Sequence, residues 1–317
     1  MFVSNAHYGH RTILNRYGGV ADGTPIPGMV EHGWNYDLGA TYEDILHPLP
    51  DPFYVWSERN QRNCKKAGGL DHVAPLGAPF LYLPPLEETI EAEPGSLLVM
   101  PIHGWEKSRL LCDFDAYVKD LAEIERNFRS ITICLYYFEH KEPRYRQPFE
   151  ARGYKVVTSG PRDDNPTFLH DLRRLLLRHE YVSSNRAQTA TFYALHLGRK
   201  VFLHGPAAGV EQRLDPSGQL YDAWQSLEWP MLLWKNFKGE AHPQIGADEL
   251  GLPFVRTRQE IRELFLWEPE QRRTLEARVS AVKERNRARI RTQRLQTWQN
   301  ALVALPYVGR HFSRGKR

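Results

Sequence analysis

Between residues 97 and 204, short apolar runs alternate with longer segments in which apolar side chains recur every three to four positions. Short apolar runs bounded by polar turns are typical of buried strands, and the longer recurrence is typical of amphipathic helices. We therefore predict strands at residues 97–102, 131–138, 155–158, 181–183 and 201–203, and helices at residues 114–128, 168–178 and 189–197. This succession predicts an α/β domain built on a parallel sheet.

The first 90 residues are richer in Gly, Pro and aromatic residues, with weaker strand patterns at residues 26–31, 53–56 and 73–75. Residues 83–95 combine prolines with glutamates, a composition typical of a linker. The chain is also long for a single core. We therefore expect three parts with a cleft between the first two: a smaller α/β lobe at residues 1–90, a Rossmann-like lobe at residues 91–250, and helices with a basic tail at residues 251–317.

The C-terminal part is predicted to contain a helix at residues 261–267 and a long helix at residues 270–304. Residues 271–317 carry 13 Lys and Arg against 2 Asp and Glu, whereas the rest of the chain holds 29 basic and 36 acidic residues. Trp298, Tyr307 and Phe312 lie among these cations, a pattern typical of segments that bind anionic membrane surfaces. The alternative is a solvated helix with a basic end. We expect no nucleic-acid partner, because the body of the chain is acidic.

Composition and cysteine usage indicate the class of protein and its compartment. With 41% hydrophobic and 25% charged residues, the chain has the composition of a folded protein. Its 3 cysteines are widely spaced and suggest neither a disulfide framework nor a zinc site. There is no apolar run long enough to span a bilayer, and the first residues lack the pattern of a signal peptide. We expect a cytoplasmic protein that can attach to the inner face of the membrane.

The segment from residue 181 to residue 203 is the most informative for function. A strand ends in Ser183, Ser184 and Asn185, and a helix begins close to Thr189. Helix N-termini present free N–H groups and partial positive charge, so hydroxyl groups placed there can bind a phosphate. The alternative is an ordinary helix cap. We predict that these four residues contact the phosphate of a nucleotide.

Residues 153–203 resemble the nucleotide-binding half of bacterial polysaccharide-assembly glycosyltransferases with the GT-B architecture. The resemblance lies in the sequence Ala-Leu-His-Leu-Gly at residues 194–198, followed by a strand, and the serine pair resembles that of sialyltransferases and related enzymes. It implies two Rossmann-like lobes, a nucleotide-sugar donor, and a glycan or lipid-linked acceptor in capsule or lipopolysaccharide assembly. It also implies transfer without a metal ion or other cofactor.

Two His-Gly-Trp triplets, at residues 32–34 and 103–105, each follow a predicted strand. Glycine lets the backbone approach a ligand closely, so each triplet is expected at the cleft, although both histidines could be structural. Sugar transfer with inversion needs a base, and histidine, with a reference pKa of about 6.5, suits that task. We predict His32 as the base, with Glu31 and Asp37 as alternatives and His7 or His10 assisting. His103 and Gly104 are predicted to contact the donor.

Cations are needed where the leaving phosphate develops charge. Lys107 and Arg109 follow the second triplet, and Arg162 follows Gly160 in a polar loop, so we predict these four residues at the donor site. Each cation could instead be a solvated loop residue. Asp163 and the acidic residue after it are interpreted as a turn and not as metal ligands.

Two other functional classes remain open from the residues alone. One is a nucleotide-sugar epimerase or hydrolase on the same scaffold, since a fold does not determine its chemistry. The other is a non-catalytic GT-B-like scaffold protein that is tethered to a membrane by its basic tail.

Overall fold

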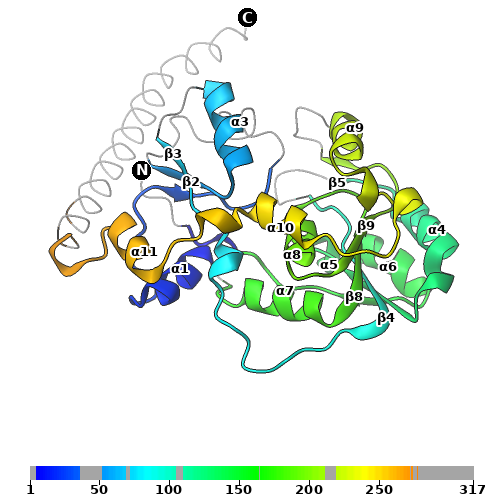
Figure 1. The fold of residues 1–317 in the computed structure, drawn as a ribbon. Coiled ribbons are helices and arrows are strands. Elements are labelled where there is room, and N and C mark those ends of the chain that lie inside the picture. The colour runs from blue at the N-terminus through cyan, green and yellow to red at the C-terminus, as the bar shows by residue number, and fades with distance from the viewer. Residues whose placement is uncertain are drawn as a thin grey trace, which may run out of the picture.

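The structure is a computed structural model that describes residues 5–35, 52–68, 72–104, 110–163, 165–210 and 219–271, together with residues 273 and 277. The described strands form a five-stranded sheet, a three-stranded sheet and a two-stranded ladder (Figure 1). Both larger sheets are entirely parallel. The predicted α/β class is therefore confirmed.

The five-stranded sheet has the order β7-β6-β4-β8-β9. Its strands are β4 (Glu93–Val99), β6 (Ser130–Cys134), β7 (Lys155–Val157), β8 (His179–Ser184) and β9 (Lys200–Leu203). All five were predicted, although β4 begins earlier and ends before Pro101, which has no amide to donate to a ladder. Along the chain, β6 and β7 are added on one side of β4, and β8 and β9 are then added on its other side. The strand order therefore reverses between β4 and β8, as in doubly wound nucleotide-binding folds.

Helices cover both faces of this sheet because successive side chains of a strand point to opposite sides. Leu97 and Val99 pack in one core cluster with α4 and α6, whereas Leu98 and Val182 pack in another with α7 and α8. These crossover helices are α4 (Phe114–Ile124), α5 (Tyr137–Lys141), α6 (Pro143–Ala151), α7 (Phe168–Leu177) and α8 (Thr189–His196). Asp113 caps α4 by accepting a hydrogen bond from the amide of Ala116.

The three-stranded sheet has the order β1-β2-β3 and belongs to the first part of the chain. It consists of β1 (Met29–Val30), β2 (Phe53–Val55) and β3 (Val73–Pro75), with α1 (His10–Gly18) before it and α3 (Glu58–Gly68) between β2 and β3. The three strands were predicted, but the two helices were not. Helix α3 is mostly polar, so its sequence carries little helical periodicity in apolar residues.

The last described elements return to both sheets. Helix α9 (Gln219–Glu228) follows β9, α10 (Pro243–Leu250) packs against α8, and α11 (Arg258–Leu264) packs against α1. Trp267, just after α11, donates from Nε1 to the carbonyl of Pro25. The remaining elements are the ladder of β5 (Leu110–Leu111) with β10 (Gly209–Val210), and six short 3₁₀ helices among the described residues: His7–Gly9, Pro79–Tyr82, Glu125–Asn127, Pro230–Leu232, Trp234–Asn236 and Leu252–Phe254.

One hydrophobic cluster includes side chains of both parallel sheets, among them Val30 and Tyr54 from the smaller sheet and Leu98 and Val182 from the larger. The division into lobes at residue 90 therefore stays a prediction. The long helix predicted at residues 270–304 and the basic tail lie almost entirely outside the described residues. None of the helices in the described part of the chain combines the length and the hydrophobicity that a bilayer span requires.

The close contact between α10 and α8 predicts a strict size limit at Gly246. A Cβ atom at this position would lie 2.3 Å from the amide nitrogen of His196 and 2.8 Å from the carbonyl oxygen of Phe192. We expect Gly246→Ala to lower the free energy of unfolding by about 1 to 3 kcal/mol in urea denaturation, because the two helices must separate. Gln244→Ala, on the exposed side of α10, should change it by less than about 0.5 kcal/mol; equal effects would contradict the contact.

Candidate functional site

The segments that follow β4 and β8 lie side by side at the carboxyl edge of the larger sheet. The amide of Met100 donates to the carbonyl of Ser183 (2.7 Å), and the amide of Ile102 donates to Oδ1 of Asn185 (2.9 Å). Nε2 of Gln188 donates to the carbonyl of Met100 (2.8 Å). Ligands of open α/β sheets bind outside the carboxyl ends of the strands, where the strand order reverses. This edge is the candidate donor site.

The serine pair at the end of β8 is enclosed within this edge. Ser183 is 0% exposed and Ser184 is 2% exposed. Oγ of Ser184 accepts hydrogen bonds from the amide of Arg186 (3.3 Å) and from Nε2 of Gln188 (3.0 Å). Asn185 is buried as well. Its side-chain amide accepts a hydrogen bond from Ile102, after β4, and donates one to the carbonyl of Pro206, after β9. Ser184 and Asn185 hold the loop together through these bonds, whereas Oγ of Ser183 is buried and has no hydrogen-bond partner among the described residues. Contact of these side chains with a donor phosphate stays a prediction.

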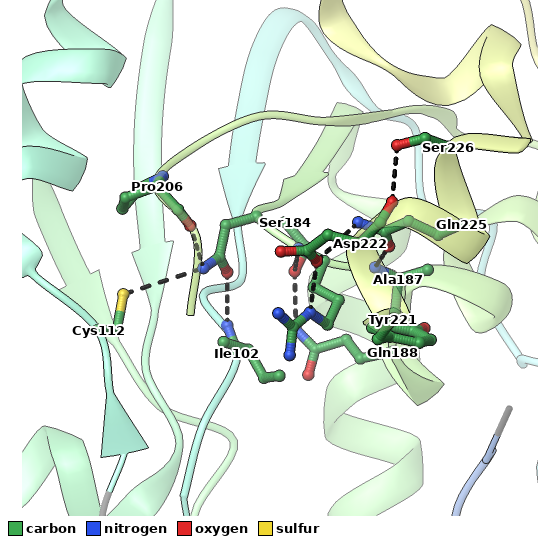
Figure 2. Close-up of polar contacts among 12 residues, drawn as sticks. Ile102, Cys112, Ser184, Ala187, Gln188, Pro206, Tyr221, Asp222, Gln225 and Ser226 are labelled. Atoms are coloured by element: carbon green, nitrogen blue, oxygen red, sulfur yellow. Dashed lines mark hydrogen bonds and ion pairs between the residues drawn. The ribbon is translucent and has the colours of Figure 1, made fainter. Parts of the chain in front are cut away.

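Arg186, which the sequence did not single out, anchors the same loop to α9, the helix that carries Tyr221, Asp222 and Gln225 in Figure 2. Its Nε donates to Oδ1 of Asp222 (2.8 Å), and its guanidinium carbon lies 5.1 Å from the ring centroid of Tyr221. The amide of Ala187 donates to Oε1 of Gln225 (2.9 Å), and the Tyr221 hydroxyl donates to the carbonyl of Ala187. Arg186 and Ala187 therefore hold the loop after β8 against α9.

The first His-Gly-Trp triplet meets the beginning of α8. The amide of Trp34 donates to Oγ1 of Thr189 (2.9 Å), and a Cβ atom at Gly33 would lie 3.3 Å from the same oxygen. The Trp34 indole packs against Phe192, with 4.5 Å between ring centroids, and its Nε1 donates to Oε2 of Glu249 (2.7 Å). The segments after β1 and β8 therefore lie against each other. In this contact, the hydroxyl oxygen of Thr189 accepts a hydrogen bond from the backbone.

Three histidines of the N-terminal region gather beside this contact. The rings of His7 and His32 lie 5.6 Å apart between centroids. His10 is buried, and burial together with the nearby His32 and His7 lowers its pKa from 6.5 to about 3, so it stays neutral at physiological pH. Nδ1 of His7 is hydrogen-bonded to Oδ1 of Asp163, in the loop after β7. The sequence placed His32 first, and the structure brings the ring of His7, which is bonded to the carboxylate of Asp163, next to the ring of His32.

Glu31, predicted as an alternative base, is 0% exposed directly after β1. Its Oε2 accepts a hydrogen bond from the amide of Trp56 (2.8 Å), and Nδ2 of Asn60 lies within 2.9 Å of both carboxyl oxygens. Burial raises its pKa from 4.5 to about 7, although the hydrogen bonds oppose the shift. Glu31 therefore connects β1, the end of β2 and α3. Its role as a base stays a prediction.

His103 and Gly104 of the second triplet contact the segment after β6. The His103 ring stacks on Tyr136, with 4.2 Å between centroids. The amide of Gly104 donates to Oε1 of Glu139 (2.9 Å), which is 5% exposed. Both predicted donor residues therefore lie at the carboxyl edge of the larger sheet. Contact with a donor is a prediction for both.

The loop after β7 is tied to the N-terminal segment. Gly160 adopts a φ of 82°, a conformation that glycine adopts without strain. The carbonyl of Arg162 accepts a hydrogen bond from the amide of Tyr8 (2.7 Å), and Nε of Arg162 lies 3.5 Å from Oδ2 of Asp163. Arg162 thus lies where the two parts of the chain meet. Asp163, interpreted from the sequence as part of a turn, is paired with His7.

Asp37, Lys107 and Arg109 lie outside the described residues. Within the described ranges, no group of three or more His, Cys, Asp and Glu side chains could hold a metal ion. The structure has two cavities whose linings include none of the predicted site residues among the described ones. One of about 220 Å³ is lined by residues of β5, α4 and α6, and one of about 490 Å³ lies between His196 and the beginning of α10.

Known protein families and curated proteins offer no match to this chain. Among solved structures, it is similar to the S. aureus MnaA-UDP co-structure, with 8% sequence identity and a TM-score of 0.38. The match covers 79% of this chain and 63% of that chain, so this chain spans less than two thirds of that protein's length. The strand order of this chain identifies its fold independently of that similarity.

Glu31 should make the free energy of unfolding depend on pH. Its pKa is about 7 in the folded chain against 4.5 ordinarily. The folded state therefore retains the proton between these values, and stability falls as the pH rises through them. At about 1.4 kcal/mol per pKa unit, the loss is about 3 kcal/mol. Urea denaturation should show Glu31→Gln gaining this amount relative to the wild type between pH 4.5 and pH 7; a constant difference would contradict the prediction.

The pair of Arg186 and Asp222 should contribute more to stability than an exposed pair of the same residue types. Its side chains are 7% and 30% exposed, against 56% and 48% for Arg16 and Asp22. Arg186→Ala removes a charge-assisted hydrogen bond and the contact of the guanidinium with the Tyr221 ring, so it should cost about 3 kcal/mol. The control Arg16→Ala should cost less than about 1 kcal/mol. Thermal and urea unfolding of both variants would check the difference, and similar losses would refute it.

Proposed function

We propose that this chain is an enzyme that binds a nucleotide sugar at the carboxyl edge of the larger sheet and transfers the sugar to an acceptor held beside the smaller sheet. The observation that carries the proposal is that segments from both parts of the chain meet at this edge. Trp34, after β1, is bonded to Thr189, after β8, and His7 is bonded to Asp163, after β7. Such an arrangement can hold two substrates on opposite sides of one contact.

On the donor side, the support comes from the topology. The loops after β4 and β8 lie where the strand order reverses, and α8 directs its N-terminus to the same edge. His103 and Gly104 follow β4, and Gly160 and Arg162 follow β7 of the same sheet. Arg162 can neutralise charge on the leaving phosphate. We assign these residues and Thr189 to the donor. The backbone around Ser183, Ser184 and Asn185 would bind it in place of their enclosed side chains.

On the acceptor side, the support comes from the histidines. Transfer needs a group that accepts the proton of the acceptor hydroxyl, and this group should lie opposite the donor. We assign this role to the pair of His32 and His7, whose rings lie 5.6 Å apart between centroids, with Glu31 as an alternative. The acceptor would be a glycan or a lipid-linked glycan of surface-polysaccharide assembly, and the basic residues at 278–317 would bring the enzyme to an anionic membrane.

The proposal is tested by thermal unfolding of the full chain with CMP, UDP, GDP, dTDP and their common sugars. At a ligand concentration 100 times the dissociation constant, binding adds about 2.7 kcal/mol to the stability of the folded state. We expect one nucleotide family to raise the unfolding temperature. Arg162→Ala should reduce this shift, and the exposed control Arg16→Ala should preserve it. If no nucleotide raises the unfolding temperature, the proposal is wrong and a non-catalytic protein is favoured.

Product analysis with the nucleotide sugar that binds separates transfer from its rival reactions. A transferase needs an acceptor and releases the nucleoside phosphate only as a glycoside forms. An epimerase or a hydrolase changes the nucleotide sugar without an acceptor. Conversion at the same rate with and without a glycan acceptor would therefore refute transfer but preserve nucleotide-sugar binding.

A further inference from the structure

The segment of residues 5–9 connects the smaller sheet to the loop after β7. Oδ1 of Asn5 accepts a hydrogen bond from the amide of Val30 (2.9 Å), and Nδ2 of Asn5 donates to the carbonyl of Gly28 (3.2 Å). Three residues later, the amide of Tyr8 donates to the carbonyl of Arg162 (2.7 Å). The segment is therefore fixed at both ends, with His7 between them.

The backbone of this segment is held in conformations that non-glycine residues rarely adopt. Asn5 and Tyr8 have φ angles of 48° and 55°. Gly9 has a φ of 75°, and a Cβ atom there would lie 3.0 Å from the carbonyl oxygen of Pro166. Strained backbone of this kind persists where the surrounding structure enforces it, and it is concentrated at functional sites. Here it places the His7 ring against Asp163.

The two side chains form a carboxylate–imidazole pair that solvent can reach. Nδ1 of His7 and Oδ1 of Asp163 are hydrogen-bonded, and the side chains are 40% and 49% exposed. Burial would raise the pKa of Asp163, but its bond to His7 and the charges of His7 and Arg162 outweigh this effect and lower it. The carboxylate thus accepts the Nδ1 proton, which leaves Nε2 of His7 as the nitrogen that can take a proton.

Two other histidines and an arginine lie around His7. His10 is buried, and its pKa of about 3 reflects that burial and the two neighbouring histidines. Arg162 lies on the far side of Asp163, 3.5 Å from its Oδ2. The His32 ring is 5.6 Å from that of His7. His7 thus combines a carboxylate partner with exposure to solvent.

From this geometry we infer that His7 is the general base of the reaction and that Asp163, from the loop after β7, is its positioning residue. The inference rests on the proposed function and specifies its acceptor side. Nε2 of His7 takes the proton of the acceptor hydroxyl while the acceptor oxygen bonds to the anomeric carbon. The bond from that carbon to the phosphate oxygen breaks, and its electron pair leaves with the nucleotide. The base is complete only where the two parts of the chain meet.

Steady-state kinetics test the inference with the nucleotide sugar that gives the largest thermal shift and its acceptor. His7→Gln should lower kcat by about 100-fold or more, because a general base is removed, and change KM for the nucleotide sugar by less than about threefold. His196→Gln, on the outer end of α8, is the matched control and should keep the wild-type kcat. Thermal unfolding of His7→Gln should be close to that of the wild type. A kcat for His7→Gln within threefold of the wild type would overturn the inference, as would a loss confined to His32→Gln.

The role of Asp163 needs a readout that a purely structural residue would not change. Nitrogen-15 NMR of histidine-labelled full-length protein should show His7 protonated at Nδ1 when neutral, and Asp163→Asn should redistribute the proton between the two ring nitrogens. The same variant should lower kcat about 10-fold or more and displace the acid limb of the pH–rate profile, and Asp163→Glu should recover part of the activity. A wild-type His7 protonated mainly at Nε2 would overturn the pair.

The two levels of the proposal fail in different ways. If the wild type binds and turns over a nucleotide sugar but His7→Gln is equally active, only the assignment of the base is wrong. If the wild type turns over no nucleotide sugar, the proposed function is wrong and the base assignment is wrong with it.

Discussion

The contacts of Trp34 are the constraint on which the candidate site depends. Its indole is 7% exposed and packs against aromatic side chains of α8 and α9, while its amide and Nε1 are bonded to Thr189 and Glu249. Glu249 is in turn paired with Arg59 of α3. One residue therefore links the end of β1 to α3, α8, α9 and α10. Without Trp34, the segments after β1 and β8 would lose the hydrogen bond and the ring contact that hold them against each other.

Two further ties limit how far the parts of the chain can move relative to each other. The N-terminal segment reaches the loop after β7, and the segment after α10 returns to α1, where Tyr17 donates to the carbonyl of Arg256. Both ties add hydrogen bonds to a hydrophobic cluster that already spans the two sheets. Interfaces that are large and hydrophobic favour a fixed arrangement over free domain motion. The groups of the site are thus positioned before any ligand binds.

The larger sheet could be predicted because strands buried on both faces consist of unbroken apolar runs, such as residues 97–99. Helix α3 could not, since most of its residues are polar and its position is set by contacts such as that of Asn60 with Glu31. Ser184, at the end of β8, shows the limit for function, because the sequence does not distinguish a hydroxyl group that faces a ligand from one that accepts a hydrogen bond from Gln188. His7 and Asp163 are 156 positions apart, so no local pattern could connect them.

The return of the chain through α10 passes so close to its neighbours that two positions exclude side chains. Gly246 lies on the backbone of α8, and a Cβ atom at Gly251 would lie 1.9 Å from the carbonyl oxygen of Trp56. Close packing requires these two glycines, and neither contacts a candidate catalytic group. In a diverged relative with a different substrate, the histidines could change while this pair of glycines, five positions apart, would have to persist. The spacing of these two glycines would then indicate common ancestry even where the catalytic residues differ.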